Sequence, residues 1–153
     1  MRSPRIKILP IVYVITFGAM MYVSSEFLPG YSYDLGNAWL LSIAVFVLGA
    51  AIIVIGGLQF RRASTTVNPF TPEKTTSLVV TGLYGFSRNP MYVGFFLLLL
   101  AVAIFLENTI TLIFLPLFVL VINRFQIRQE EKILETIFGV EYRQYVKRVR
   151  RWI

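Results

Sequence analysis

Four long stretches of the chain consist almost entirely of apolar residues, and short polar segments separate them. They cover residues 8–25, 38–60, 90–106 and 109–123. An α-helix needs about 20 apolar residues to cross a hydrocarbon core of about 30 Å, and these lengths reach or approach that number. Helices are the expected structure, because a spanning segment must satisfy its backbone hydrogen bonds internally. We therefore expect an all-α integral membrane protein with about four transmembrane helices.

The last two apolar stretches are short, and only Glu107 and Asn108 separate them, which predicts a tight helical hairpin. Pro116 lies within the fourth stretch, where it should kink or locally open the helix. Good helix formers continue past Asn123 without a breaker as far as Gly139, a natural C-cap. The fourth helix should therefore emerge from the membrane and continue for about four turns.

The chain ends with a segment, from about Glu141, in which apolar and basic residues follow a helical period. Basic residues occupy most positions between its apolar ones, which are Tyr142, Tyr145, Val146, Val149, Trp152 and Ile153. This pattern is typical of an amphipathic helix at the membrane interface. Such a helix could be a surface anchor only, or a lid over a site that faces the lipid.

Basic residues are distributed very unevenly among the polar segments. The chain has 15 Lys and Arg against 8 Asp and Glu, a net charge of +7. All the basic residues fall before the first stretch, between the second and third, or after the fourth. The positive-inside rule then places both termini in the cytoplasm. Topology and attraction to anionic lipid explain the basic excess, so we predict the lipid bilayer, and no nucleic acid, as a partner.

The first two apolar stretches contain no charged residue. Residues 1–60, which include both, are therefore expected to form two scaffold spans. The basic residues before the first stretch also fit the start of a signal peptide. However, its apolar run is long for that purpose, and no clear cleavage site follows. Glycines of the second stretch are expected at positions of close helix packing, and these are Gly49, Gly56 and Gly57.

The composition restricts the possible chemistry. Apolar residues make up 56% of the chain, and its mean hydropathy of +0.68 is above that of ordinary soluble domains. Cys and His are both absent, which excludes thiolate zinc sites, redox thiol pairs and imidazole bases. Carboxylates, Arg, Tyr, Asn or a bound cofactor must therefore carry any reaction, and we predict no metal site.

The polar segment 61–89 ends where the third helix should begin. Asn89 is a strong N-cap candidate and Pro90 suits the first helical position, so the free N–H groups of this helix should face the segment. Such a helix end attracts anions. Earlier in the same segment, Thr71 could cap a short helix that starts at Pro72.

Residues just before this helix end are suited to ligand binding. Gly82 and Gly85 would let the backbone fold tightly over a ligand, and Arg88 could bind a carboxylate or phosphate. The extension of the fourth helix adds Glu130 and Glu131, which must have different roles because neighbouring helical residues point about 100° apart. Without a ligand, these features would describe a well-capped membrane helix and a solvated acidic face.

Six motifs occur in a characteristic order between about residues 60 and 153. They are Thr66–Phe70, Gly82–Gly85, Arg88–Gly94, Arg124–Glu131, Phe138–Tyr145 and Val149–Trp152. Together they resemble small bacterial members of the isoprenylcysteine carboxyl methyltransferase family, which is related to the phospholipid N-methyltransferases. Family members commonly carry His at the position of Asn89, and some phospholipid methyltransferase-like members carry Asn.

The resemblance implies one membrane domain over residues 1–153, in a bacterial inner membrane, that uses S-adenosylmethionine to methylate a lipophilic acceptor. Arg88 would hold the carboxylate of this donor, Glu131 its ammonium, and Arg88 and Glu130 would serve catalysis. Tyr84 or Tyr92 could pack on its adenine or sulfonium. The implied cofactor residues are Gly82, Tyr84, Gly85, Arg88, Asn89, Pro90, Tyr92, Gly94 and Glu131. The implied acceptor contacts are Arg124, Tyr142 and Tyr145.

Neither the acceptor nor the reaction follows uniquely from these residues. A carboxylate acceptor needs no base, whereas an ammonium or thiol must lose a proton to Glu130, a Tyr or water. The absence of His therefore favours an acceptor that is already nucleophilic. Two other functions remain open, an NADPH-dependent enzyme like the sterol reductases, which have a similar Arg-x-Pro-x-Tyr-x-Gly motif, and a non-catalytic membrane protein.

Overall fold

The computed structural model describes residues 9–62 and 77–153. Its helices are α1 (Pro10–Phe27), α2 (Ala38–Arg62), α3 (Pro90–Leu106), α4 (Phe114–Ile122), α5 (Arg128–Phe138) and α6 (Val140–Arg148). Two isolated β-bridges occur in these ranges, but no named strand does. The all-helical fold is confirmed, whereas the helix expected at Pro72 lies outside the described residues.

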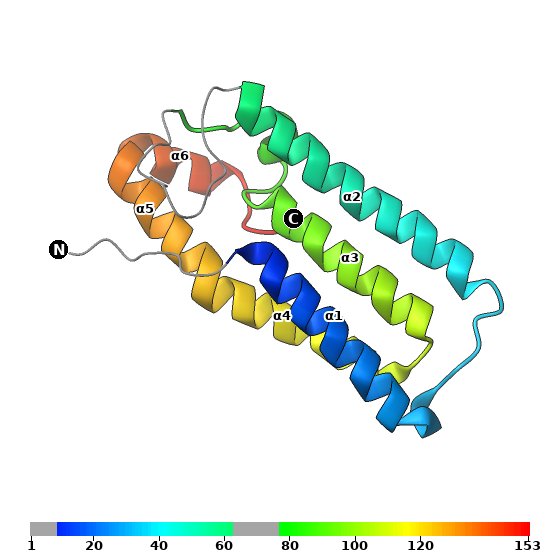
Figure 1. The fold of residues 1–153 in the computed structure, drawn as a ribbon. Coiled ribbons are helices and arrows are strands. Elements are labelled where there is room, and N and C mark those ends of the chain that lie inside the picture. Colours follow the sequence, from blue (N-terminus) through cyan, green and yellow to red (C-terminus); the bar gives the residue numbers. More distant parts are fainter. Residues whose placement is uncertain (1–8, 63–76) are drawn as a thin grey trace.

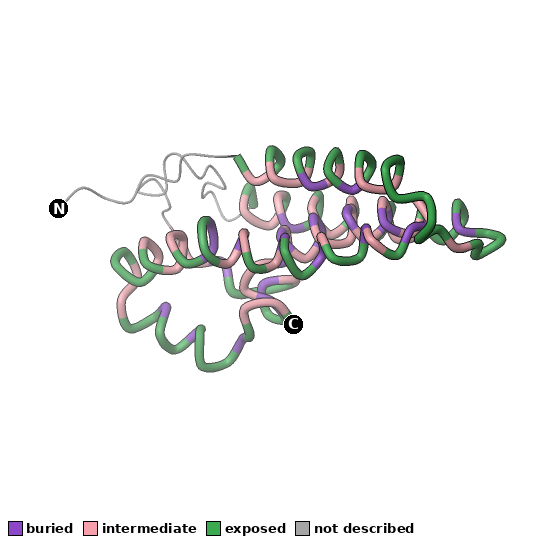
Figure 2. Tube along the Cα trace, turned by 90° about the horizontal axis from the view of Figure 1, so that it is seen from below, coloured by how far each residue is buried: buried purple, intermediate pink, exposed green. Residues whose placement is uncertain are grey.

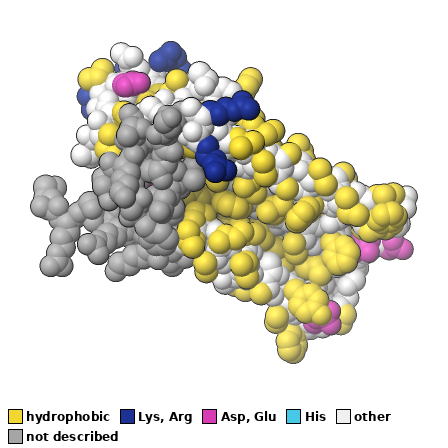
Figure 3. Space-filling model, turned by 45° about the horizontal axis from the view of Figure 1, so that its top comes forward, with side chains coloured by type: hydrophobic (Ala, Val, Ile, Leu, Met, Phe, Trp, Pro, Cys, Tyr) yellow, Lys and Arg dark blue, Asp and Glu magenta, His cyan; other side chains and the backbone are white. Residues whose placement is uncertain are grey.

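Three helical segments are long and apolar enough to cross a membrane. They are α1, α2 and the continuous stretch Thr109–Phe138, which includes α4 and α5, while α3 is a shorter apolar helix of 17 residues. Figure 1 shows α3 in the middle of the bundle, with α2 on one side and α1 and α4 on the other. The outer sides of the helices are exposed (Figure 2), many large hydrophobic residues of α1 and α2 are among the exposed ones, and the face seen in Figure 3 is largely apolar, as expected for contact with lipid.

Close backbone contact joins α2 to α3. A Cβ atom on Gly49 would lie 2.9 Å from the carbonyl oxygen of Gly94, so both positions need glycine. Ser42 Oγ also donates a hydrogen bond to the carbonyl of Ala101 at 2.9 Å. Small residues and polar bonds of this kind associate helices where lipid removes the hydrophobic driving force. The close-packing prediction is confirmed for Gly49 and Gly56 but is wrong for Gly57, which faces open space.

Helices α1, α3 and α4 enclose the main apolar core. Met21, Leu99 and Phe118 are completely buried there, and Phe17 packs edge-on against Phe118 with 5.6 Å between ring centroids. The core fixes α3 against the fourth helix. The first turn of α3 and the polar extension of the fourth helix are thereby held side by side.

The predicted hairpin between α3 and the fourth helix is present. Glu107 ends α3 with φ of +46°, and its carboxylate accepts a hydrogen bond from the backbone N–H of Leu35 at 2.8 Å. Asn108 is fully buried and donates to the carbonyl of Leu28 at 2.9 Å. The turn is therefore tied to the connection between α1 and α2.

The fourth helix is continuous but contains two segments that are not α-helical. The 3₁₀ helix η4 (Thr109–Ile113) precedes α4, and Pro116 lies in the first turn of α4, so the irregular winding is ahead of the proline. The π-helix η5 (Asn123–Ile127) then separates α4 from α5, which sequence analysis did not predict. Helix α5 ends at Gly139 with φ of +49°, as expected.

The C-terminal segment differs from the predicted amphipathic helix. Helix α6 stops at Arg148, and Val149 is already extended. The predicted membrane-facing residues Tyr142, Tyr145 and Val149 are instead buried against Leu78, Leu134 and Phe138. These three residues therefore pack on the protein itself, whereas Val146 and Ile153 of the same predicted face are exposed, and membrane contact of this segment stays a prediction.

Candidate functional site

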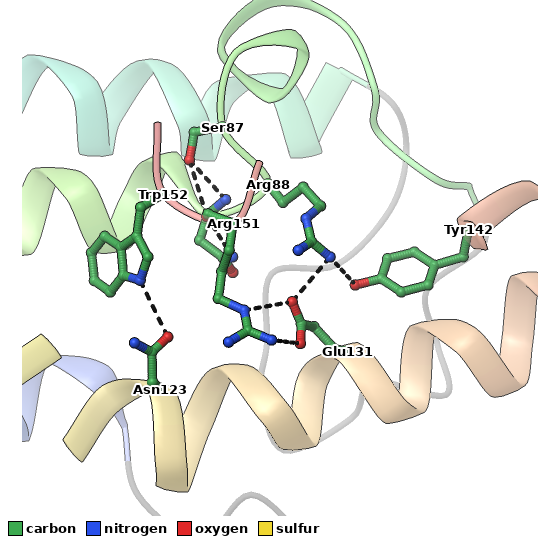
Figure 4. Close-up of polar contacts among 8 residues, drawn as sticks. Ser87, Arg88, Asn123, Glu131, Tyr142, Arg151 and Trp152 are labelled. Atoms are coloured by element: carbon green, nitrogen blue, oxygen red, sulfur yellow. Dashed lines mark hydrogen bonds and ion pairs between the residues drawn. The ribbon is translucent and has the colours of Figure 1, made fainter. Parts of the chain in front are cut away.

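An ion cluster lies where the start of α3, helix α5 and the C-terminal tail meet (Figure 4). The Glu131 carboxylate on α5 pairs with Arg88 Nη1, which is 3.0 Å from Oε1. Arg151 of the tail donates to the same carboxylate through Nε, at 3.0 Å, and through Nη2, at 2.6 Å. The exposed fractions of these side chains are 12% for Arg88, 18% for Glu131 and 35% for Arg151. One acid thus holds two guanidinium groups in a largely buried position.

Tyr142 of α6 lies beside this cluster (Figure 4). Its hydroxyl accepts a hydrogen bond from Arg88 Nη1 at 3.4 Å. Burial, and secondly the negative charge of Glu131, raise the pKa of Tyr142 to about 12, so that the phenol is neutral at physiological pH. Arg88 Nε is buried and has no hydrogen-bond acceptor among the residues that the structure describes. Arg88 therefore retains one unused donor.

The neighbouring acid belongs to a second network. Glu130 accepts a hydrogen bond from the Tyr92 hydroxyl at 2.6 Å and one from Gln126 Nε2 at 3.3 Å. Tyr92 and Gln126 are both buried. Consecutive helical residues point in different directions, so the two acids serve separate networks, as predicted.

The loop before α3 has a defined structure. The 3₁₀ helix η3 (Gly82–Gly85) begins with Gly82 at φ of +61°, where a Cβ would also overlap the Gln59 amide, so that glycine is required. Gly85 has no such requirement, because a Cβ there would meet only the Val80 carbonyl oxygen at 3.6 Å. Tyr84 is buried, with its ring edge-on to Phe60. The described part of this loop therefore has one obligatory glycine.

Tyr145 of α6 connects this loop to the C-terminal helix. Its hydroxyl donates to the carbonyl of Tyr84 at 2.6 Å, and burial raises the pKa values of both tyrosines. Tyr84, Tyr142 and Tyr145 are thus brought to one side of the ion cluster.

The start of α3 is held by the C-terminal tail. Asn89 is at the N-cap position and Pro90 is the first helical residue, as predicted, but the Asn89 side chain makes no cap. Its Nδ2 donates instead to the carbonyl of Arg151 at 3.0 Å. The backbone N–H of Arg88 donates to the carbonyl of Arg150 at 2.9 Å. The predicted use of the Asn89 side chain as a helix cap is therefore wrong: a cap would need its Oδ1 to accept from the first turn of α3, whereas its Nδ2 donates to the tail.

Sequence reasoning missed two members of this site. Arg151 was assigned to the basic face of a helix, and Trp152 to its apolar face. In the structure, Trp152 Nε1 donates to Asn123 Oδ1 at 3.2 Å, and the indole packs on the main core. The motif Val149–Trp152 was a signal that these residues matter. It lies far from Arg88 in sequence, so it did not reveal which residues they contact.

Two other predicted site residues lie apart from the ion cluster. Gly94 is buried against Gly49 and Ile53 of α2, where it serves helix packing. Arg124 on the π-helix is exposed. Cofactor binding by Gly94 and acceptor binding by Arg124 stay predictions.

Comparison with known proteins identifies the class. The model of the family "Phospholipid methyltransferase" matches residues 38–141, more than half of the chain, and the match includes α2, α3, the ion-cluster residues Arg88 and Glu131, and α5. The chain is therefore an integral membrane protein that belongs to the phospholipid methyltransferase family. No solved structure matches it.

Individual relatives include two named enzymes. A Protein-S-isoprenylcysteine O-methyltransferase of Saccharomyces cerevisiae is 32% identical over 113 residues, which cover 67% of this chain and 46% of the relative. One of the same name from Schizosaccharomyces pombe is 40% identical over 80 residues, 50% of this chain and 33% of the relative. An uncharacterized protein of Haemophilus influenzae is 48% identical over 63 residues, 41% of this chain and all of the relative. The chain spans less than half the length of both yeast relatives.

Proposed function

We propose that this protein is a membrane methyltransferase that takes its methyl group from S-adenosylmethionine and transfers it to a lipophilic acceptor. The observation that carries the proposal is the ion cluster of Arg88, Glu131 and Arg151 at the start of α3. The family supports methyl transfer, and the chemistry of the cluster supports this particular donor.

The residues present fit the amino-acid part of this donor. Its carboxylate requires a cationic hydrogen-bond donor, and Arg88 is largely buried, with no acceptor for Nε in the described part of the chain. Its ammonium requires an anion, which Glu131 supplies 3.0 Å from Arg88. Opposite charges at this spacing suit a zwitterion, which carries both charges on adjoining groups. When bound, the donor supplies an electrophilic methyl group on its sulfonium.

The protein then contributes mainly position. Methyl transfer is an in-line displacement, and holding the two reactants in line can provide much of the acceleration. Glu130 and Tyr92 form a partly buried hydrogen-bonded pair beside the cluster. For an acceptor that is already nucleophilic this pair only orients it, whereas for a protonated acceptor Glu130 would take the proton.

The proposed topology places the site on the cytoplasmic side of a bacterial inner membrane. Basic side chains gather at the end of the bundle that carries α5 and α6, as Figure 3 shows from one side. By the positive-inside rule this end, and with it both termini, would be cytoplasmic. A site at the end of apolar helices is reached most directly from the bilayer, and the yeast relatives are named for isoprenylcysteine, which supports a lipophilic acceptor.

Two measurements test the proposal. Isothermal titration of the purified protein with S-adenosylmethionine, and separately with NADPH, should show binding of the first only. Incubation with methyl-labelled donor and a total lipid extract should then label a lipid product. Binding of NADPH alone would indicate a reductase, and binding of neither compound would indicate a non-catalytic protein.

A further inference from the structure

The C-terminal tail, residues 149–153, is attached to the site at several points. Ser87 and Arg150 form a parallel β-bridge, and Asn89 Nδ2 and Ser87 Oγ both donate to the carbonyl of Arg151, at 3.0 and 3.4 Å. The Trp152 indole is anchored on the opposite side, at Asn123 of the π-helix. Arg151 is therefore held between two anchors, and its side chain points to Glu131 (Figure 4).

The charges bonded together in the cluster do not balance. Arg88 and Arg151 bring two positive charges, and Glu131 brings one negative charge. Glu130 bonds instead to Tyr92 and Gln126. The cluster thus has the capacity to accept one more anionic group.

The two guanidinium groups differ in their freedom to take that group. Arg88 is deeply buried, and its Nη1 is bonded to both Glu131 and Tyr142. Arg151 is about three times as exposed, at 35% against 12%, and among residues 9–62 and 77–153 its side chain bonds to Glu131 alone. Arg88 and Arg151 together occupy both acceptor sites of Glu131 Oε1, and Arg151 occupies one of the two on Oε2. An incoming ammonium that bonds to both oxygens must therefore replace one guanidinium bond at Oε1, and Arg151 is the more exposed of the two arginines. The displaced guanidinium would then be beside the ligand and free to pair.

We propose that Arg151 is a donor-binding residue that exchanges partners, leaving Glu131 for the donor ammonium and pairing with the donor carboxylate beside Arg88. The inference rests on the proposed function, since it concerns the same donor. It adds a ligand contact from the tail and an order of events within the site. Trp152 has a positioning role, because its bond to Asn123 keeps Arg151 within reach.

The test is a double-mutant-type binding cycle for the proposed pair of the Arg151 guanidinium and the donor carboxylate. Protein variants remove the guanidinium, and a second ligand lacks the carboxylate. The protein variants are Arg151→Gln, Arg151→Lys and the control Arg150→Gln, which removes the same charge from an exposed neighbour. The ligands are S-adenosylmethionine and its decarboxylated form, which keeps the ammonium. Dissociation constants come from isothermal titration, and thermal unfolding checks that every variant is folded.

Arg151→Gln should weaken S-adenosylmethionine binding by about tenfold or more, the size expected for a charge-assisted bond. Its affinity for the decarboxylated ligand should be unchanged or higher, because Glu131 has lost a competitor. Arg151→Lys should recover part of the loss, and Arg150→Gln should bind both ligands like the wild type.

Three results would overturn this proposal and leave the proposed donor in place. Equal weakening of both ligands by Arg151→Gln would mean a structural role, and no change for either ligand would remove Arg151 from the site. Equal effects of Arg150→Gln and Arg151→Gln would indicate only the general field of the basic tail. A folded wild-type protein that binds neither ligand would instead refute the proposed donor, and this inference with it.

Discussion

Glu130 and Glu131 are consecutive in sequence but bond to entirely different partners. Glu130 accepts from Tyr92 at 2.6 Å, and Glu131 joins the two arginines. Helix α5 starts directly after a π-helix, a local winding that is often found at functional sites. The two acids can therefore be tested separately.

Glu131→Gln should lower donor affinity by about an order of magnitude or more, because it removes the negative charge but keeps the size of the side chain. Glu130→Gln, the matched variant one residue away, should leave donor affinity near that of the wild type. Isothermal titration measures both affinities. Small and equal effects would remove this acidic pair from the donor site.

Turnover at saturating donor then determines what Glu130 does. A large loss in Glu130→Gln with normal donor binding would assign it to the chemistry or to acceptor positioning. Unchanged turnover would leave Glu130 as a structural partner of Tyr92. Methyl transfer to the labelled lipid product is the measurement.

Arg88→Ala should weaken donor binding by about 1.5 to 3 kcal/mol, the usual size of a hydrogen bond to a charged group. Arg143→Ala is a suitable control, since Arg143 is an exposed residue of α6. Its ion pair with Glu135, at 3.5 Å, is also exposed. The control should bind the donor normally. A folded Arg88→Ala variant with normal affinity would place the donor elsewhere.

Membrane topology is tested with reporters at two positions. A reporter fused after Ile153 should be cytoplasmic, and one inserted near Tyr31 should be external, because all the basic residues lie on one side of the predicted spans. Accessibility to an impermeant reagent distinguishes the two sides. Finding both reporters on the same side would contradict the proposed topology.

Contact between α2 and α3 is tested by two substitutions in one helix. Gly49→Ala should lower stability by about 1 to 3 kcal/mol, because its methyl group would meet the backbone of α3. Gly57→Ala adds the same methyl group where the structure leaves open space, and alanine favours helix, so it should be neutral or slightly stabilising. Thermal unfolding in detergent compares them. Equal stabilities would show that α2 does not pack as described.

Most of the fold could be predicted from the sequence, but less of the site. The apolar stretches, the turn at Glu107 and the helix end at Gly139 follow from local patterns, and all are present. The end of α6 was misplaced because Val149 and Trp152 also fit a helical period. Burial of Tyr142 and Tyr145 against α5 and Leu78 is a tertiary contact that periodicity cannot distinguish from membrane contact.

By itself, the sequence determined which segments are helical and apolar and where helix α3 starts. These properties depend on side-chain chemistry and on short-range backbone rules, and both act within a few residues. Only the tertiary structure decided that Arg151 and Arg88 share Glu131, although they lie 63 positions apart in the sequence. The reason is that an ion cluster requires side chains from three separate segments to meet, and their meeting depends on how α3, α5 and the tail pack together.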